Sequence, residues 1–172
     1  MTNLPNTINS PTVLRLFDAI QLAIPNGNKR LEFGGSVGQT DEQPHSYHRS
    51  WDDIVHDNGY SVHYYGDKHR LRGLTRYSCA LDLTFPNADD MVKYTARLHH
   101  LAITHGGKLY WKYGVREFAG TLDNRTTFGY DTTRGVRTFG WDDTHLFHIH
   151  VSFNRRLITS RNILRLADAF RD

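Results

Sequence analysis

Two stretches of the chain alternate between apolar and polar residues, as a strand with one buried face does. In residues 78–85 the apolar row is opposed by Ala80, Asp82 and Thr84. In residues 146–153 the opposing row contains His148, His150 and Ser152. We therefore expect two strands that each bury one face in a core. Their other faces would present one carboxylate and two imidazoles.

Three further segments have apolar residues at helical spacing. The first begins at Ser10-Pro11, an expected N-cap followed by proline at the first helical position, and stops at Pro25. The second spans about 88–103 behind Asn87 as its cap, and the third spans 161–170. We also expect a strand at residues 115–119.

Two regions lack such periodicity. Residues 34–78 are polar, aromatic and rich in histidine, and we interpret them as long loops with short strands such as 61–65. Residues 120–140 are rich in Thr, Arg and Gly, which indicates a surface loop or hairpin. The order of elements predicts an α+β fold, with all of residues 1–172 in a single domain around a central, mostly antiparallel sheet flanked by helices.

The composition of the chain limits the classes of partner and metal ligand that we expect. The 172 residues include 38% hydrophobic residues, which is typical of a globular domain. The net charge is only +3, and the basic residues are scattered along the chain without a dense run. Binding to nucleic acid is therefore not expected. The single cysteine excludes an internal disulfide and leaves histidine and carboxylate as the metal ligands. Without a signal peptide or membrane span, we expect synthesis in a cytoplasm and no membrane partner.

The two polar strand faces are the main candidate for chemistry. If the strands are neighbours, Asp82, His148 and His150 converge as ligands for zinc, which favours histidine and carboxylate. His145, three residues before His148, is placed to act as a general base. The alternative is that these histidines only pack or form hydrogen bonds on a wet sheet face.

Weaker candidates lie elsewhere in the chain. Arg116 and Glu117 on the expected strand at 115–119 would bind a substrate carboxylate or act as a base, although a surface ion pair is the favoured interpretation. Tyr65 belongs to an aromatic segment that would form a glycan-binding surface or simply pack in loops.

The two motifs together resemble the family of zinc D-Ala-D-Ala carboxypeptidases and hedgehog-type peptidases, which includes phage endolysins and tail peptidases. That family has Ser-x-His-x-x-Gly-x-Ala-x-Asp on one strand and Glu-x-x-His, often with a further x-His, on another. Here Ala80 and Asp82 match the first motif, and His148 matches the ligand of the second. The resemblance implies a small α+β domain that binds zinc and cleaves the stem peptides of bacterial peptidoglycan.

The chain departs from that pattern at important positions. Thr75 stands where the family has its first histidine ligand, and His145 stands at the position of the family's glutamate base. His69 or His63 from the preceding loop, or His150, would have to supply the missing ligand. Otherwise the fold would persist without metal. Two functions follow as expectations. One is a phage-type zinc peptidase acting on the cell wall. The other is a noncatalytic virion component, bound to other virion proteins, on a degenerate peptidase fold. The expected location is accordingly the virion or the bacterial cell wall.

Overall fold

A computed structural model describes residues 7–35, 76–105 and 108–172 of the chain. Its centre is a six-stranded sheet in the order β1-β2-β6-β3-β4-β5, and every neighbouring pair of strands is antiparallel. The strands are β1 (Glu32–Gly35), β2 (Ala80–Thr84), β3 (Val115–Thr121), β4 (Thr127–Asp131), β5 (Val136–Thr138) and β6 (His148–Phe153). The predicted α+β class with a central antiparallel sheet is confirmed.

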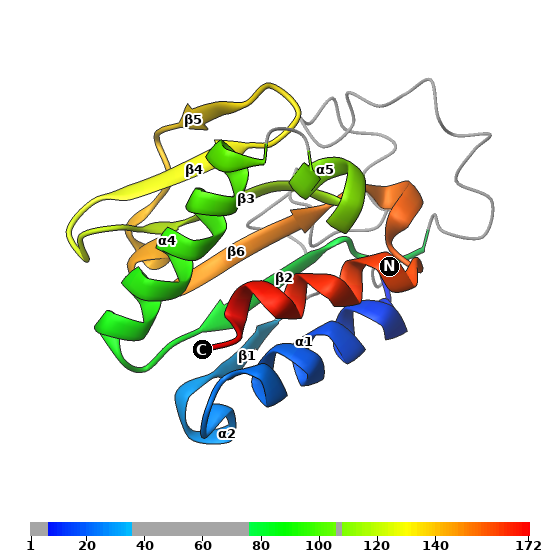
Figure 1. The fold of residues 1–172 in the computed structure, drawn as a ribbon, viewed down its shortest axis with the longest axis horizontal. Coiled ribbons are helices and arrows are strands. Elements are labelled where there is room, and N and C mark those ends of the chain that lie inside the picture. Colours follow the sequence, from blue (N-terminus) through cyan, green and yellow to red (C-terminus); the bar gives the residue numbers. More distant parts are fainter. Residues whose placement is uncertain (1–6, 36–75, 106–107) are drawn as a thin grey trace, which may run out of the picture.

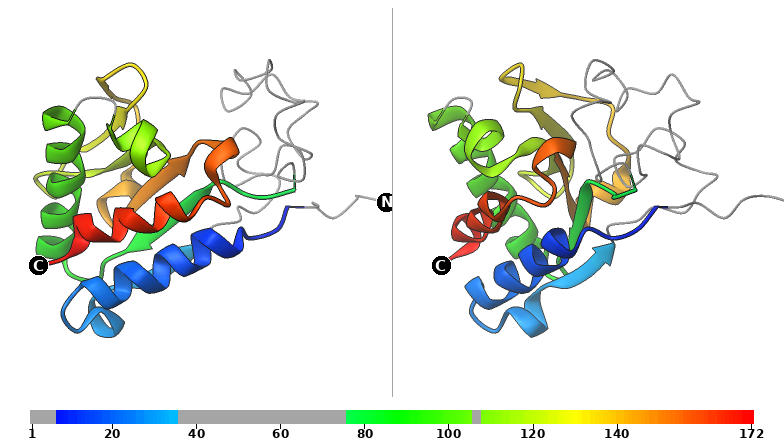
Figure 2. Two further views of the ribbon diagram at one scale, coloured as in Figure 1. Left: turned by 45° about the vertical axis from the view of Figure 1, so that its right-hand side comes forward. Right: turned by 90° about the vertical axis from the view of Figure 1, so that its right-hand side faces the viewer.

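Helices cover one face of this sheet. Figure 1 shows this layer in front of the strands, and the side view of Figure 2 separates the two layers. The main members are α1 (Pro11–Ala23), α4 (Ala88–Thr104), α5 (Lys108–Tyr113) and the 3-10 helix η5 (Arg161–Phe170), and the short α2 (Gly27–Arg30) follows α1. The 3-10 helix η3 (Asp143–Leu146) instead contacts β3 and β6, and η4 (Arg155–Leu157) follows β6.

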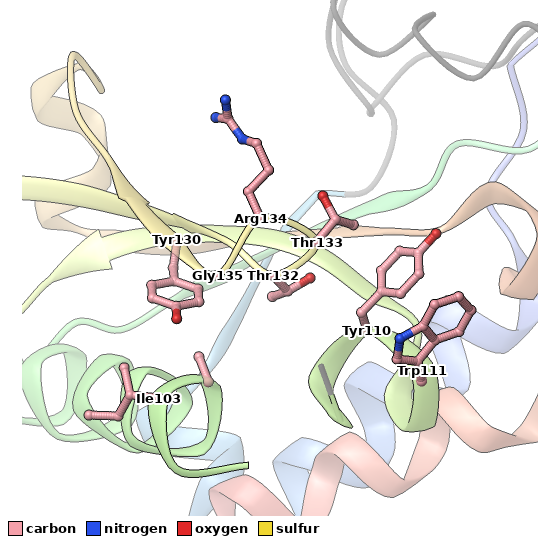
Figure 3. A pocket seen from close by; sticks show the side chains of 9 residues that line it. Ile103, Tyr110, Trp111, Tyr130, Thr132, Thr133, Arg134 and Gly135 are labelled. Atoms are coloured by element: carbon pink, nitrogen blue, oxygen red, sulfur yellow. The ribbon is translucent and has the colours of Figure 1, made fainter. Parts of the chain in front are cut away.

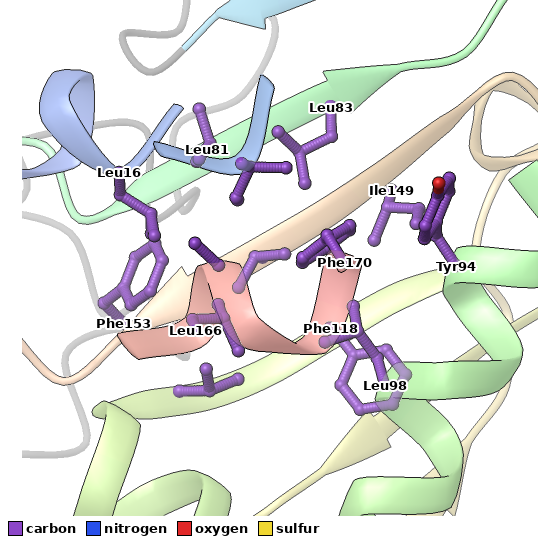
Figure 4. Packing of buried hydrophobic residues seen from close by; sticks show 14 of the residues in the cluster. Leu16, Leu81, Leu83, Tyr94, Leu98, Phe118, Ile149, Phe153, Leu166 and Phe170 are labelled. Carbon is purple, nitrogen blue, oxygen red and sulfur yellow. The ribbon is translucent and has the colours of Figure 1, made fainter. Parts of the chain in front are cut away.

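The hydrophobic core fills the space between the sheet and the helical layer. The alternating rows of β2 and β6 supply fully buried side chains such as Leu81, Leu83 and Ile149. They meet Tyr94 of α4 and Phe170 of η5, as Figure 4 shows. Because strand side chains alternate, burying this row turns the polar row of the same strands to the opposite face.

Two predicted helix caps have different outcomes. The Asn87 side chain accepts a hydrogen bond from the Asp89 amide at 2.9 Å, so this cap is confirmed. Ser10 occupies the N-cap position of α1, but its side chain makes no capping hydrogen bond. The predicted start of the helix, with Ser10 as N-cap and Pro11 in its first turn, is nevertheless confirmed, while the buried Ser10 hydroxyl donates to the carbonyl oxygen of Ile158 at 2.8 Å.

Strand β6 is shorter than the alternating pattern predicts. Residues 143–146 form η3, and Phe147 is 66% exposed at its end instead of lying in the core row. The strand therefore starts at His148, and His145 belongs to a different element from the other two histidines. The last predicted helix forms as the 3-10 helix η5, which Ser160 caps through the Asn162 amide.

The regions between the long predicted elements contain further strands and short helices. Residues 120–140 contain the end of β3 and the β4–β5 hairpin, whereas α2, α5 and β1 were not predicted. The expected strand at 61–65 lies outside the described residues. Within the described ranges, no helix is both long and apolar enough to cross a bilayer.

Candidate functional site

The polar face of the sheet brings together Asp82 of β2 with His148 and His150 of β6. Asp82 pairs with His150 in the antiparallel register, and His148 pairs with Thr84. The distance from Asp82 Oδ1 to His150 Nδ1 is 2.9 Å, and that from Asp82 Oδ1 to His148 Nε2 is 3.8 Å. The predicted convergence of these three residues is therefore present.

His145 reaches the same cluster from η3. Its ring centroid lies 4.6 Å from that of His148 and 6.0 Å from that of His150. Its Nδ1 lies 3.2 Å from the carbonyl oxygen of Asp142 and 3.3 Å from Asp142 Oδ1. With Nδ1 facing two acceptors, Nδ1 carries the proton and Nε2 is the nitrogen that accepts one.

Burial and charge set the protonation of His145. Its side chain is almost buried, and this desolvation, followed by the nearby His150, lowers the pKa of His145. The neighbouring Asp142 opposes the shift but does not reverse it. The imidazole is therefore neutral at neutral pH, which is the form that a general base requires.

Trp141 packs beside the histidines. Its ring centroid lies 5.0 Å from that of His145 and 6.0 Å from that of His150. Gly129 of β4 makes this position available, because a Cβ atom there would lie 2.2 Å from Trp141 Nε1. The indole N–H donates to Thr138 Oγ1 at 3.0 Å, which holds the ring against the hairpin.

Glu117 is buried on β3 and connects to the cluster through Ser152. Its side chain is only 3% exposed, so the expected position on the surface is wrong. The Ser152 hydroxyl lies 2.7 Å from His150 Nε2 and 3.5 Å from Glu117 Oε1. Arg116, the other half of the expected surface pair, donates to Asp131 Oδ1 at 2.5 Å.

The described residues fit a zinc ion only in part. Two ligands on one zinc, each about 2.1 Å from the metal, lie at most about 4 Å apart. Asp82 Oδ1 and His148 Nε2, at 3.8 Å, satisfy this limit. His150 does not add a third ligand in this geometry, because its two ring nitrogens contact Asp82 and Ser152.

If the site binds zinc, a third ligand would have to come from another residue. Among the described residues, no group of three or more His, Cys, Asp or Glu side chains is arranged to hold a metal ion. Thr75 at the family's ligand position, the substitute ligands His63 and His69 and the substrate-binding candidate Tyr65 all lie outside the described residues.

A separate pocket of about 380 Å³ opens beside the helical layer. Figure 3 shows it between the end of α4, α5 and the turn that joins β4 to β5. Its lining is partly aromatic, with Tyr110, Trp111 and Tyr130. None of the residues that line it belongs to the cluster of Asp82 and the histidines.

Sequence reasoning missed three contributors to the cluster: Asp142, Trp141 and Ser152. Asp142 could have been predicted as a helix N-cap, because aspartate is one of the residues preferred at that position. In the structure Asp142 caps η3 by accepting a hydrogen bond from the Thr144 amide. Ser152 lay in the predicted polar row but has no distinctive chemistry by itself. Nothing local in the sequence placed Trp141 next to the histidines.

Comparison of the chain with protein-family models, with curated proteins and with solved structures finds no match.

Proposed function

We propose that this protein is a metal-dependent peptidase of the D-Ala-D-Ala carboxypeptidase type that acts on the stem peptides of bacterial peptidoglycan. The observation that carries the proposal is the meeting of Asp82 and His148 on neighbouring strands, with 3.8 Å between Oδ1 and Nε2. These are the two residues that match the ligands of the family motifs. The antiparallel sheet with helices on one face agrees with the fold that the resemblance implies.

The proposed roles follow from the positions of the side chains. Asp82 and His148 would hold zinc together with a ligand from outside the described residues. Zinc, when bound, supplies a Lewis acid and lowers the pKa of a bound water toward about 7. His145 would donate its Nδ1 hydrogen to Asp142, which leaves Nε2 to accept a proton from water. It stands at the position where the family has glutamate.

Zinc content and hydrolysis of the purified chain test this proposal. We expect about one zinc per chain and release of D-Ala from a synthetic stem peptide ending in D-Ala-D-Ala. His148→Ala and Asp82→Asn should each abolish both properties. His100→Ala, on the exposed surface of α4, is the matched control and should leave both unchanged. Full hydrolysis after chelation and in His148→Ala would overturn the proposal.

A second candidate is a noncatalytic virion component on the same fold. The observation that favours it is the incomplete metal site, since His150 is held by Asp82 and Ser152 and His145 replaces the family's glutamate. It predicts no bound metal by elemental analysis, no turnover, and co-purification with virus particles. A monomer that binds zinc and lyses cell walls would argue against it.

A further inference from the structure

The pocket between the end of α4, α5 and the turn after β4 combines aromatic rings with hydroxyl groups. Figure 3 shows Ile103 and Tyr130 on one side and Tyr110 and Trp111 on the other, with Thr132 between them. Its volume of about 380 Å³ lies within the range of about 300–1,000 Å³ that is usual for small-molecule sites. The pocket is therefore large enough to hold a small ring compound.

Tyr130 brings a hydroxyl group without a partner to this pocket. Tyr130 is only 7% exposed, yet its hydroxyl makes no hydrogen bond to any residue in the ranges 7–35, 76–105 and 108–172. Buried polar side chains nearly always have a hydrogen-bond partner, and a buried tyrosine hydroxyl usually finds one. The Tyr130 hydroxyl is therefore available to a molecule that enters the pocket.

Two large apolar side chains at the rim of the pocket are exposed. Trp111 of α5 is 77% exposed, and Ile103 near the end of α4 is 56% exposed. Single exposed apolar residues are ordinary on a protein surface, but here two of them line the same pocket. A ligand beside them would remove apolar surface from water, so the rim suits a ligand with an apolar face.

The aromatic walls are held in place before any ligand binds. The Tyr110 hydroxyl accepts a hydrogen bond from Asn154 Nδ2 at 2.8 Å, and Trp111 packs edge-to-face on the Tyr110 ring with 4.8 Å between centroids. The Tyr130 ring stacks on Phe118 with 5.9 Å between centroids. Walls that are already fixed lose little conformational entropy on binding, which favours affinity.

The polar groups beside the rings are neutral. Asp131 at the start of the turn forms ion pairs with Arg116 and Arg134, so the Arg134 charge is already engaged. The Arg134 side chain also points away from the aromatic rings in Figure 3. The Thr132 hydroxyl donates to the carbonyl oxygen of Val115 at 2.6 Å and keeps lone pairs that accept. A ligand that donates and accepts hydrogen bonds without a charge matches these groups.

We propose that this pocket binds a neutral saccharide, a hexose or N-acetylhexosamine unit of a glycan, which packs one ring face on Trp111 and hydrogen-bonds to the Tyr130 hydroxyl. The C–H bonds on one face of a pyranose ring are attracted to the negative face of an aromatic ring. The hydroxyls around its edge pair with Tyr130 and donate to Thr132. A purely aromatic ligand would cover the rim but leave the Tyr130 hydroxyl unpaired.

Titration of the full chain with three saccharides tests the site. The probes are tri-N-acetylchitotriose, cellotriose and maltotriose, with free indole as an apolar comparison. The chain has three tryptophans, Trp51, Trp111 and Trp141, and the indole N–H signal that is missing from the 15N spectrum of Trp111→Ala belongs to Trp111. We expect at least one saccharide to shift the Trp111 signal in a saturable way, while the Trp141 signal beside the histidines stays in place.

Calorimetry of three variants measures the contribution of each wall. Trp111→Ala should weaken saccharide binding at least about 10-fold, because buried tryptophan contacts often dominate a binding site. Tyr130→Phe removes one hydroxyl and should weaken binding about 2- to 10-fold, the value of one net hydrogen bond. Phe139→Ala is the matched control, because Phe139 is an aromatic residue that is 78% exposed outside the pocket, and it should bind as the wild type does.

The proposal is overturned if none of the three saccharides binds in a saturable way, if Trp111→Ala binds as tightly as the wild type, or if indole binds more tightly than every saccharide. The site does not depend on the chain being a peptidase, because none of its lining residues belongs to the Asp82 and histidine cluster. His148→Ala should therefore bind the saccharide with unchanged affinity. A chain that binds the saccharide but neither zinc nor stem peptide would reject the proposed peptidase and leave this site in place.

Discussion

The three histidines between positions 145 and 150 have different surroundings and therefore different chemistry. His145 lies on η3 with Nδ1 on Asp142, whereas His150 lies on β6 between Asp82 and Ser152. His148 lies 3.8 Å from Asp82 through its Nε2 atom. The sequence predicts that such residues cluster, because strand alternation is regular. It does not separate their roles, because these depend on partners far away in the chain.

Glu117 makes the stability of the protein depend on pH. Its pKa is raised from 4.5 to about 8, so the folded state holds a proton that the unfolded state releases. This stabilisation is complete below about pH 4.5 and is lost as the pH rises to about 8. Within that window the contribution falls by at most about 1.4 kcal/mol per pH unit.

Glu117→Gln should remove this component of the pH dependence. Chemical denaturation from pH 5 to pH 9 gives the free energy of unfolding of both proteins. We expect the variant to gain stability relative to the wild type as the pH rises. A constant difference between the two proteins across the range would show that Glu117 has an ordinary pKa.

At the scale of the elements, regular patterns predicted the sheet and the long helices, and short elements escaped. β2 and β3 were predicted because alternation or composition extends over most of their length, and α4 because its cap and apolar face agree. α2 has four residues and β1 has four, which is too short for a periodic signal. Phe147 was misplaced because η3 interrupts the alternation, and its start depends on Asp142.

Close packing of α4 on β3 gives a prediction at Gly120. A Cβ atom at this position would lie 2.7 Å from Thr95 Oγ1 and 3.0 Å from Thr95 Cγ2. Gly120→Ala should therefore lower the free energy of unfolding by about 1–3 kcal/mol through overpacking. Thermal or chemical denaturation followed by circular dichroism measures the loss.

Thr95→Ala provides the matched background. The Thr95 hydroxyl is buried and has no hydrogen-bond partner in the described part of the chain, so its removal alone should cost little. In this background Gly120→Ala should be better tolerated, with a coupling of about 0.5–3 kcal/mol. Additive effects of the two substitutions would mean that Gly120 and Thr95 are farther apart than the structure has them.

For the whole molecule, the sheet separates structural residues from candidate functional ones. Fully buried Phe118 faces the helical layer, whereas Asp82 and His148 lie partly exposed on the other face. Phe118→Ala should cost about 3–5 kcal/mol because it leaves a cavity in the core. His148→Ala should change the free energy of unfolding by less than about 1 kcal/mol, since surface substitutions rarely cost more.

Denaturation curves of the two variants, measured without metal, check this contrast. Equal losses would mean that the polar face also supports folding at its exposed positions. The general architecture was predictable because burial follows periodicity. The completeness of the candidate site was not predictable, because the contacts that occupy both ring nitrogens of His150 depend on how distant strands pair.

The two-sided sheet also affects how the protein can change over generations. Mutations at the partly exposed positions of the polar face, such as 82 and 148, alter the chemistry offered to a ligand while the apolar packing behind them stays intact. An ancestral activity can thus drift, disappear or be replaced without an unfolded intermediate in the lineage. A combinatorial library at these positions should therefore retain a high fraction of soluble members, which makes the fold a practical scaffold for selection experiments.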